Sequence, residues 1–283
     1  MSTNRFYSFY RHGKRFDITM FNDDEFRTLL GHLDRPWQGY RKVRKGVKKR
    51  LSRRMDEIGC RTIADYLEVL NRSPEEKDAC EQCLLVTISR YFRDRQLWQT
   101  LKERLLPLLV QRFEPPIRIW CAGCACGEEA YSLAIVLDSM ENSPIVELLA
   151  TDTQNACLDR AGKGLYGHSS LKEVPVDLRA AYFVSMRGGR SFKIRKNRLP
   201  PIQWQQHNLL DPPPPGPFQM ILMRNNLLTY HQGPLLRAAF DRITATLPPG
   251  GYLVVGSHEK LPASTSTFIR DPQCPWVYSM NHL

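Results

Sequence analysis

The stretch IRIWCAGCACGEEAYSLAIVL, residues 117–137, decides the fold of this chain. An apolar run leads into a turn of small residues and then into a helical pattern, which predicts a strand, a turn and a helix of a parallel sheet. The turn reads G-x-A-x-G from Gly123 to Gly127. In this context small residues let a ligand lie against the backbone at the carboxyl edge of the sheet. Several classes of nucleotide ligand use such a turn, so it predicts a site without naming the ligand.

Two glutamates, Glu128 and Glu129, open the helix and narrow the choice of ligand. A pyrophosphate binds at the bare positive end of a helix, and two carboxylates there would oppose it. S-adenosylmethionine has no phosphate and carries a sulfonium and an ammonium group, so carboxylates beside the turn suit it. The alternative is that both glutamates only interact with the helix dipole. Asp152, at the end of the next predicted strand, can accept both hydroxyls of an adenosine ribose, which is equally a feature of NAD sites.

Strands and helices alternate beyond about residue 115, and this alternation predicts an α/β fold with a doubly wound, mostly parallel, Rossmann-like sheet. We assign residues 74–283 to this domain. Residues of about 164–207 interrupt the alternation and predict a small antiparallel β insert. We expect strands over 117–123, 146–152, 218–224 and 252–256, with helices over 128–140, 154–163 and 234–247.

The first 73 residues predict a separate, basic, all-helical domain. They carry 17 Lys and Arg against 9 Asp and Glu, and residues 40–55, YRKVRKGVKKRLSRRM, hold nine basic residues and no acidic one. Val43, Val47, Leu51 and Met55 recur every four residues, so one stripe of this helix is apolar and the rest is cationic. The alternative is a solvated helix with no partner. Because like charges repel, we predict instead a functional basic face, with substrate-binding residues Arg44, Lys48, Arg53 and Arg54.

The formal net charge of +11 indicates an acidic partner: nucleic acid, an anionic membrane or an acidic protein surface. We find no signal-peptide pattern and no run of roughly 20 apolar residues, so we expect a cytoplasmic protein with its eight cysteines reduced. Cys80-x-x-Cys83 and Cys121-x-x-Cys124 have the spacing of zinc half-sites. The first lies in a helical pattern and the second in the glycine turn, so we expect no metal.

Five stretches together resemble the CheR-type methyltransferases, which methylate glutamates of chemoreceptors with S-adenosylmethionine. Their order and spacing fit that family over nearly the whole chain, and LPPGGYLVVGSHEKL (247–261) adds the expected last strand. The stretches are VTISRYFRD (86–94), IWCAGCACGEEAYSLAI (119–135), LLATD (148–152), HNLLDP (207–212) and ILMRNNLLTY (221–230).

The resemblance implies a class I methyltransferase fold and a set of residues that bind the methyl donor. Thr87 and Ser89 stand where the family usually has Asn and Thr, and Arg93 is expected to orient the donor near the reacting methyl group. Together with the glycines of the turn, the implied donor-binding residues are Thr87, Ser89, Arg93, Gly123, Gly127, Glu128, Asp152, Asn208, Leu209, Arg224 and Asn225.

The catalytic residues implied are Arg93 and a tyrosine that the family places five residues after the arginine at 224. Here that position is Thr229, and Tyr230 follows one place late. A one-residue bulge would restore its position. Gln219 and Cys121 also stand where acidic residues are common. The family partner would be an acidic helical protein, the cytoplasmic domain of a chemoreceptor, and we expect a monomer that reaches the membrane only through it.

Two other functions remain open at this stage. A nucleic-acid methyltransferase would also need a donor site and a basic surface, and Asp211-Pro212-Pro213-Pro214 is similar to the D-P-P-Y type signature. It precedes the strand at 218–224 instead of following it, and it lacks the aromatic residue that would stack on a flipped base. The other alternative is a non-catalytic CheR-like binding module, which the displaced Tyr230 and the replaced Asn at position 87 suggest.

Overall fold

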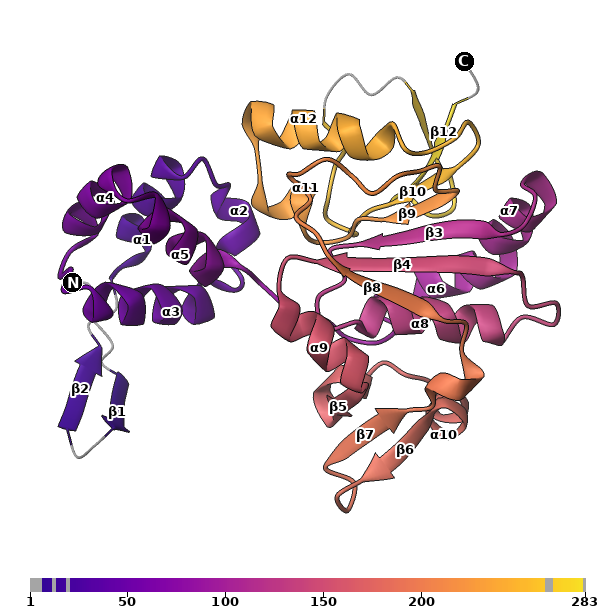
Figure 1. The fold of residues 1–283 in the computed structure, drawn as a ribbon, viewed down its shortest axis with the longest axis horizontal. Coiled ribbons are helices and arrows are strands. Elements are labelled where there is room, and N and C mark those ends of the chain that lie inside the picture. The colour runs from indigo at the N-terminus through magenta and orange to yellow at the C-terminus, as the bar shows by residue number, and fades with distance from the viewer. Residues whose placement is uncertain (1–6, 12–13, 19–20, 263–266, 282–283) are drawn as a thin grey trace. The chain divides into compact units, whose positions relative to one another are not determined.

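The structure, a computed structural model, describes residues 7–11, 14–18, 21–262 and 267–281, and the first two of these ranges by their backbone alone (Figure 1). The chain divides into two compact units. The helical unit comprises Met1–Val86 and Thr229–Gly233, and the sheet unit comprises Thr87–Leu228 and Pro234–Leu283. Over the ranges described, no helix is both long and apolar enough to cross a membrane.

Five helices form the helical unit around one apolar core. The predicted stripe of the basic helix is confirmed, because Val47, Leu51 and Met55 are buried in that core. Ser73 caps the last helix by accepting a hydrogen bond from the Glu76 backbone N–H, as its place before a proline predicts. The helices are α1 (Asp23–His32), α2 (Trp37–Tyr40), α3 (Arg44–Glu57), α4 (Ile63–Arg72) and α5 (Pro74–Leu84).

The expected all-helical character of residues 1–73 needs correction. Strands β1 (Tyr7–Arg11) and β2 (Lys14–Ile18) pair as an antiparallel hairpin. The segment YSFYR-HG-KRFDI alternates aromatic and polar residues over a short span, which is the period of a strand rather than of a helix.

The boundary of the helical unit also differs from the expected residue 73. Helix α5 belongs to the helical unit, because Cys80 and Leu84 are buried in its core. The Tyr66 hydroxyl donates to Glu76, 2.9 Å away, and Arg54 forms an ion pair with the same carboxylate. The break at Ser73–Pro74 is therefore a helix–helix turn within one unit.

A seven-stranded sheet forms the centre of the sheet unit and confirms the predicted doubly wound, mostly parallel architecture (Figure 1). Its order is β11-β12-β10-β9-β3-β4-β8, and β12 alone runs antiparallel to its neighbours. The strands are β3 (Ile117–Ala122), β4 (Val146–Asp152), β8 (Ile202–Gln206), β9 (Met220–Leu222), β10 (Tyr252–Val254), β11 (Phe268–Arg270) and β12 (Val277–Met280).

Helices cover both faces of this sheet, and successive residues of β3 show it. Ile119 and Cys121 pack in one core with α8 (Glu128–Asp138) and with the helix that contains α6 and α7. Trp120 and Ala122 pack in another core with Phe240 of α12. The remaining elements are α6 (Arg95–Thr100), a π-helical turn (Leu101–Leu105), α7 (Leu106–Arg112), α9 (Asn155–Lys163), α10 (Val176–Tyr182), α11 (Leu227–Tyr230) and α12 (Gly233–Thr244).

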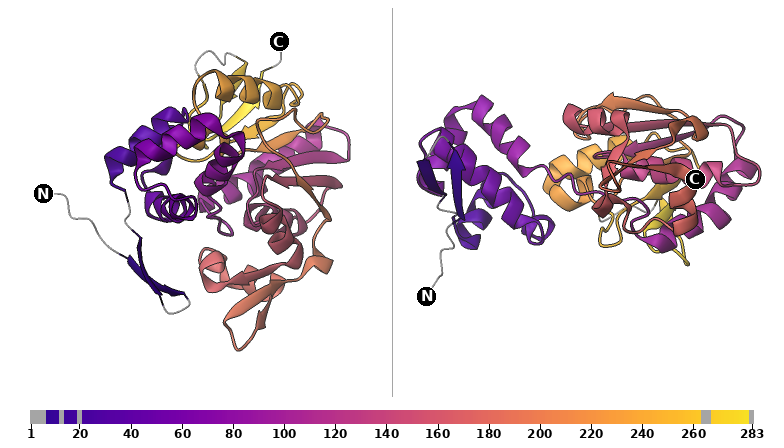
Figure 2. Two further views of the ribbon diagram at one scale, coloured as in Figure 1. Left: turned by 60° about the vertical axis from the view of Figure 1, so that its left-hand side comes forward. Right: turned by 90° about the horizontal axis from the view of Figure 1, so that it is seen from below.

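The antiparallel insert is present but ends earlier than expected. Strands β5 (Leu165–Gly167), β6 (Phe183–Met186) and β7 (Ser191–Ile194) form a separate three-stranded sheet beside α9 (Figure 2). The stretch IQWQQ, which we assigned to the insert, is instead β8 at the edge of the main sheet, where Ile202 pairs with Leu148. Its alternation of apolar and polar residues reflects an edge strand with one exposed face.

Candidate functional site

The candidate site lies where three adjacent parallel strands end. The turn of residues 123–127 follows β3, Asp152 ends β4, and Arg224 comes two residues after β9. Because β3 pairs with both other strands in parallel, these three features share the carboxyl edge of the sheet, the usual place for ligands in such folds. The loop that holds Thr87, Ser89 and Arg93 belongs to the same unit.

The two glycines of the turn are required by the packing of the protein itself. Gly123 has φ +75° and Gly127 has φ +86°, a region that favours glycine. A Cβ atom at Gly123 would lie 2.4 Å from the Asn226 side-chain nitrogen, and one at Gly127 would lie 2.7 Å from the Ala161 Cβ. Close approach of protein neighbours therefore accounts for both glycines.

Asp152 joins the turn to the start of α9. Its Oδ2 atom accepts the Ala125 N–H at 2.8 Å, and its Oδ1 atom accepts the Gln154 N–H at 3.0 Å. Burial raises the pKa of this carboxyl group, and the backbone hydrogen bonds oppose that rise. Each oxygen still has a lone pair to accept a further hydrogen bond, so the carboxylate can receive two neighbouring hydroxyl groups.

The two glutamates that open α8 have different partners. Glu128 is 2% exposed, and its Oε1 atom accepts from the Ser170 hydroxyl at 3.0 Å and lies 3.9 Å from Arg160. Burial raises the pKa of Glu128, and the Ser89 side chain lowers it, so two predicted site residues lie near each other here. The Oε2 atom of Glu128 is buried with no hydrogen-bond partner among the residues described.

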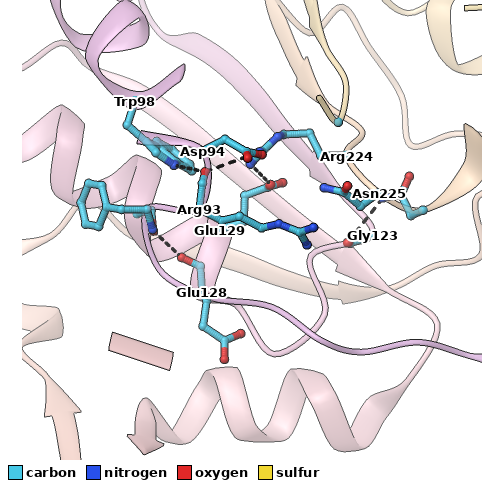
Figure 3. Close-up of polar contacts among 12 residues, drawn as sticks. Arg93, Asp94, Trp98, Gly123, Glu128, Glu129, Arg224 and Asn225 are labelled. Carbon is cyan, nitrogen blue, oxygen red and sulfur yellow. Dashed lines mark hydrogen bonds and ion pairs between the residues drawn. The ribbon is translucent and has the colours of Figure 1, made fainter. Parts of the chain in front are cut away.

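Glu129 instead binds Arg224, in what we term the Arg224 cluster: Arg224, Glu129 and Asp94 (Figure 3). The Arg224 guanidinium donates to Glu129 at 2.8 Å and to Asp94 at 2.5 Å. Arg224 is 6% exposed, and burial raises the pKa of Glu129 although Arg224 lowers it. The Glu128 carboxylate points away from this cluster (Figure 3). Adjacent positions on a helix point about 100° apart, which separates the two glutamates.

The Arg224 cluster also fixes the backbone at Arg93. The residues on either side, Phe92 and Asp94, have φ values of 53° and 63°, which non-glycine residues rarely adopt. The carbonyl of Arg93 accepts the Trp98 indole N–H at 2.8 Å, and Arg224 lies 3.5 Å from the same oxygen. Such backbone conformations persist where surrounding contacts enforce them, and they concentrate at functional sites.

Three further residues complete the loop after β9, and the sequence did not single them out. Glu259 accepts the backbone N–H groups of Asn225 at 2.9 Å and of Gly256 at 2.6 Å. Asn226 donates to the Ala122 carbonyl at 2.5 Å. Asp94 was visible only as part of the F-R-D motif. Asn226 and Glu259 hold the loop to the ends of β3 and β10, and Asp94 binds Arg224. The contacts of Asn226 with Ala122, of Glu259 with Asn225 and of Asp94 with Arg224 join residues too distant in sequence for a motif to reveal.

Asn208 and Leu209 follow β8 and differ in exposure. The Asn208 side-chain oxygen accepts the Leu210 N–H at 3.0 Å, and the residue is exposed. Leu209 is buried against Trp120 and its neighbours in the core beside α12. Asn208 can therefore offer its amide to a ligand, whereas the Leu209 side chain supports the fold.

The expected bulge before Tyr230 is corrected by the structure. Strand β9 ends at Leu222, Asn225 turns the chain with φ 55°, and α11 then contains both Thr229 and Tyr230. The Tyr230 ring lies 5.1 Å from the Tyr40 ring within the helical unit. The one-residue displacement of the tyrosine therefore falls in a helical turn and not in a strand bulge. Thr229 and Tyr230 consequently lie on different faces of that turn.

The four predicted basic residues of α3 are mostly bound by neighbouring carboxylates. Arg44 and Lys48 form ion pairs with Asp23 at 2.9 and 3.0 Å, and Lys48 is 7% exposed. Arg54 binds Glu76 at 2.5 Å, and Arg53 remains exposed. Of the four expected residues only Arg53 is exposed, and it pairs with Glu57 at 3.8 Å. The exposed cations of this region are Arg41, Lys42, Lys45, Lys49 and Arg53.

Metal binding is not indicated where the structure describes side chains. No group of three or more His, Cys, Asp or Glu residues there could hold an ion. All eight cysteines are free thiols. Burial raises the pKa of the Cys121 and Cys124 thiols well above the ordinary value.

The site residues fit S-adenosylmethionine by the chemistry of their remaining hydrogen-bonding capacity. The buried Oε2 atom of Glu128 can accept a hydrogen bond from an ammonium group, and the carboxylate favours a nearby cation. The two oxygens of Asp152 suit the two hydroxyls of a ribose. The Arg224 cluster, with two carboxylates for one cation, offers no surplus positive charge for a pyrophosphate.

Comparisons with known proteins agree with this chemistry. Residues 87–275 match the family described as "CheR methyltransferase, SAM binding domain". A probable chemotaxis protein methyltransferase of Rhizobium etli is 32% identical over 228 residues, which are 76% of this chain and 84% of that protein. Chemotaxis protein methyltransferase 2 of Pseudomonas aeruginosa is 31% identical over 75% of this chain and 77% of its own.

Another relative is much longer than this chain. It is an uncharacterised 104.1 kDa protein of Rhodobacter capsulatus, 30% identical over 76% of this chain, which covers 23% of its length. The family description and the site chemistry together identify the cofactor of residues 87–275 as S-adenosylmethionine.

Proposed function

Because this chain belongs to the CheR methyltransferases, we propose that it transfers the methyl group of S-adenosylmethionine to glutamate side chains of an acidic helical protein. The proposed substrate is the cytoplasmic domain of a chemoreceptor. The observation that carries the proposal is the family match, together with relatives whose names specify chemotaxis protein methyltransferases.

The chemistry makes few demands on the side chains of the site. S-adenosylmethionine supplies a methyl group on a sulfonium centre. A glutamate side chain has a pKa of about 4.3 and is ionised at neutral pH, so no general base is needed. The residues of the chain have to hold the nucleophile in line and exclude water from it. A site built from an arginine–carboxylate cluster and buried acceptors suits this task better than proton transfer.

Each site residue has a proposed role within this scheme. Glu128 accepts from the ammonium group of the cofactor, Asp152 accepts from its ribose, and Asn208 binds near the adenine. Arg93, held by its fixed backbone, is the proposed catalytic residue that aligns the reacting groups. Ser89 favours the ionised form of Glu128, because burial raises the pKa of that carboxyl group and the Ser89 side chain lowers it.

Tyr230 is the second proposed catalytic residue, and its hydroxyl is the group to test. The variant Tyr230→Phe keeps the ring that packs on Tyr40 and removes the hydroxyl. We expect kcat to fall by about tenfold with an unchanged affinity for S-adenosylmethionine, as for the loss of one hydrogen bond in a transition state. An unchanged kcat would restrict Tyr230 to a structural role.

The proposed substrate contact is the exposed basic stripe, which we define as Lys45, Lys49 and Arg53. These residues are four positions apart and share one face of α3. We substitute this stripe for the side chains first expected, because Lys48 is buried and Arg44 and Arg54 are only partly exposed, whereas the three residues of the stripe are exposed. Arg53 also pairs with Glu57 at 3.8 Å, an exposed contact that contributes little in water. A face of one sign suits a helix rich in glutamate.

The decisive experiment is to incubate the purified protein with methyl-labelled S-adenosylmethionine and membranes of its own host, then to treat the labelled product with mild base. Carboxyl methyl esters release volatile methanol under these conditions. We expect label on membrane protein that is released as methanol, and loss of labelling in the Arg93→Ala variant. The inactive variant should retain the fold of the wild-type protein by circular dichroism.

Other outcomes would replace the proposal. Label that resists base would indicate methylation of nitrogen or of nucleic acid, and the basic stripe would then be assigned to phosphates. Cofactor binding by calorimetry without any label would favour a binding module that does not catalyse transfer.

A further inference from the structure

Two cysteines of the sheet unit lie in direct contact beside the cofactor turn. The sulfur atoms of Cys126 and Cys157 are 3.3 Å apart, and both are thiols. Cys126 belongs to the turn after β3, and Cys157 is the third residue of α9. Each residue is 6% exposed, so the pair lies just beneath the surface. Neither thiol has a role in the proposed methyl transfer.

The surroundings favour ionisation of one thiol of the pair. The hydrogen bond shared with Cys157 lowers the pKa of Cys126, and the same bond raises the pKa of Cys157. Both sulfurs lie at the amino-terminal end of α9, where the helix dipole stabilises negative charge. By contrast, burial raises the pKa of Cys124, the nearest other cysteine of the turn.

The same two segments are joined a second time by Asp152. Its Oδ2 atom holds Ala125, the neighbour of Cys126, and its Oδ1 atom holds Gln154, which precedes α9. The sulfur pair and the carboxylate are therefore parallel links between the turn and the helix. A change in one link changes the geometry of the other.

We propose that Cys126 and Cys157 form an oxidation site at which a hydroperoxide makes a disulfide and thereby weakens the binding of S-adenosylmethionine. The inference rests on the proposed role of Asp152 in holding the cofactor ribose. It adds control by an oxidant to the proposed function.

The reaction balances with one equivalent of hydrogen peroxide. The Cys126 thiolate attacks the peroxide, the O–O bond breaks, and a sulfenic acid and a hydroxide result; the hydroxide takes up the proton that Cys126 released on ionising and becomes one water. The Cys157 thiol then attacks the sulfenic sulfur, the S–S bond forms, and the hydroxyl group leaves with a proton as a second water. The two sulfurs lose two electrons in total, and the peroxide gains them.

Disulfide formation requires the sulfur atoms of the turn and of α9 to approach each other. A disulfide holds its sulfurs about 2.05 Å apart, so the pair must close by about 1.3 Å from 3.3 Å. The turn and α9 are closely packed here, since a Cβ added at Gly127 would lie 2.7 Å from the Ala161 Cβ. The part of the closure that side-chain rotation does not supply falls on the turn and the start of α9, the two segments that Asp152 joins, and changes its hydrogen bonds.

The test compares the full-length protein reduced and after treatment with hydrogen peroxide. Peptide mass spectrometry without reduction should find the Cys126 and Cys157 peptides linked. Calorimetry should find that the Kd for S-adenosylmethionine rises by about tenfold, which corresponds to 1.4 kcal/mol. Dithiothreitol should restore the original Kd.

Two variants separate this site from other thiols and from misfolding. Cys157→Ser should bind the cofactor as the reduced wild-type protein does, both with and without peroxide. Cys83→Ser, which removes a more accessible thiol of the helical unit, should respond to peroxide as the wild type does. If Cys157→Ser fails to fold, Cys126→Ser serves the same purpose.

Two results would overturn the inference. One is peroxide-treated protein in which the two cysteines stay unlinked, and the other is a linked protein with an unchanged Kd. Methyl transfer by the reduced protein is measured separately, so failure of the proposed function and failure of the oxidation site are distinguishable.

Discussion

Helix α3 and the Arg224 cluster both concentrate charged side chains, but the cluster buries them and α3 exposes them. In the cluster one cation, 6% exposed, binds two carboxylates. On α3 the three cations of the basic stripe are exposed along one face of the helix. Buried charges must be paired, because desolvation costs several kcal/mol per ion. Exposed charges stay hydrated, so the first arrangement orders a site and the second is the proposed contact for a substrate.

Removing one arginine from each place should give the largest contrast. We expect Arg224→Met to lower the free energy of unfolding by about 3–5 kcal/mol, because it leaves Glu129 and Asp94 without their buried counter-ion. We expect Arg53→Met, on the exposed stripe, to change it by less than about 1 kcal/mol. Urea unfolding of the cofactor-free proteins measures both. Equal effects would mean that burial does not distinguish the two regions.

Reversing the charge of the basic stripe should affect substrate turnover and not the fold. For the triple variant Lys45→Glu, Lys49→Glu and Arg53→Glu, we expect kcat/KM for the receptor to fall by about 100-fold at low salt. The difference from wild type should shrink at about 0.5 M salt, where charges are screened within a few ångströms. Lys102→Glu, a surface reversal in the sheet unit, is the matched control. A loss of the same size in that control would remove the stripe from substrate binding.

Neutral substitutions of the two glutamates of α8 should have different effects, one mainly on cofactor affinity and the other mainly on stability. Glu128→Gln should weaken S-adenosylmethionine binding by about tenfold, through the loss of a charge-assisted hydrogen bond. Glu129→Gln should mainly lower stability, because its partner Arg224 loses half of its counter-charge. Calorimetry and urea unfolding of both variants measure the two effects. A larger loss of affinity in Glu129→Gln would exchange the proposed roles.

The smallest expected effect is a pH dependence that Glu128 gives to stability and to cofactor binding. Burial raises its pKa above the ordinary value for glutamate. Between the ordinary and the raised pKa, the folded protein binds more protons than the unfolded chain, so its contribution to the free energy of unfolding falls as pH rises. Cofactor affinity should rise over the same window, because ionised Glu128 attracts the ammonium group. In Glu128→Gln, both the free energy of unfolding and the cofactor affinity should depend less on pH. If stability and affinity changed in the same direction with pH in the wild-type protein, the assignment to Glu128 would be contradicted.

The sequence predicted those elements of the fold that have a local pattern. It did not predict elements whose place in a sheet depends on pairing with residues distant in the sequence. The strand, turn and helix over 117–137 were predicted to within a few residues, because apolar runs and glycine spacing are local signals. Strands β11 and β12 were not predicted. Strand β8 was assigned to the wrong sheet, because its polar residues reflect an exposed edge.

For the site, the sequence predicted residues that the structure brings to one edge of the sheet, but it did not predict their contacts. Glu128 and Glu129 have the same chemistry and adjacent positions, and only the contact with Arg224, 95 residues later in the chain, distinguishes them. On α3 the apolar stripe was correct, but the long stem of Lys48 lets it reach Asp23 and become buried. The exposed face is consequently that of Lys45 and Lys49. Tertiary contacts, which composition does not encode, decide such cases.

The segment Thr229–Gly233 makes both units discontinuous in the sequence. It belongs to the helical unit although both of its flanks belong to the sheet unit, and Arg35 donates to the Tyr230 carbonyl at 3.1 Å. The chain therefore passes between the units three times. A gene fragment that begins at residue 87 would therefore encode a sheet unit that still carries these five residues but lacks Tyr40, on which the Tyr230 ring packs. We expect the aromatic ring of Tyr230 to be exposed to water in such a fragment.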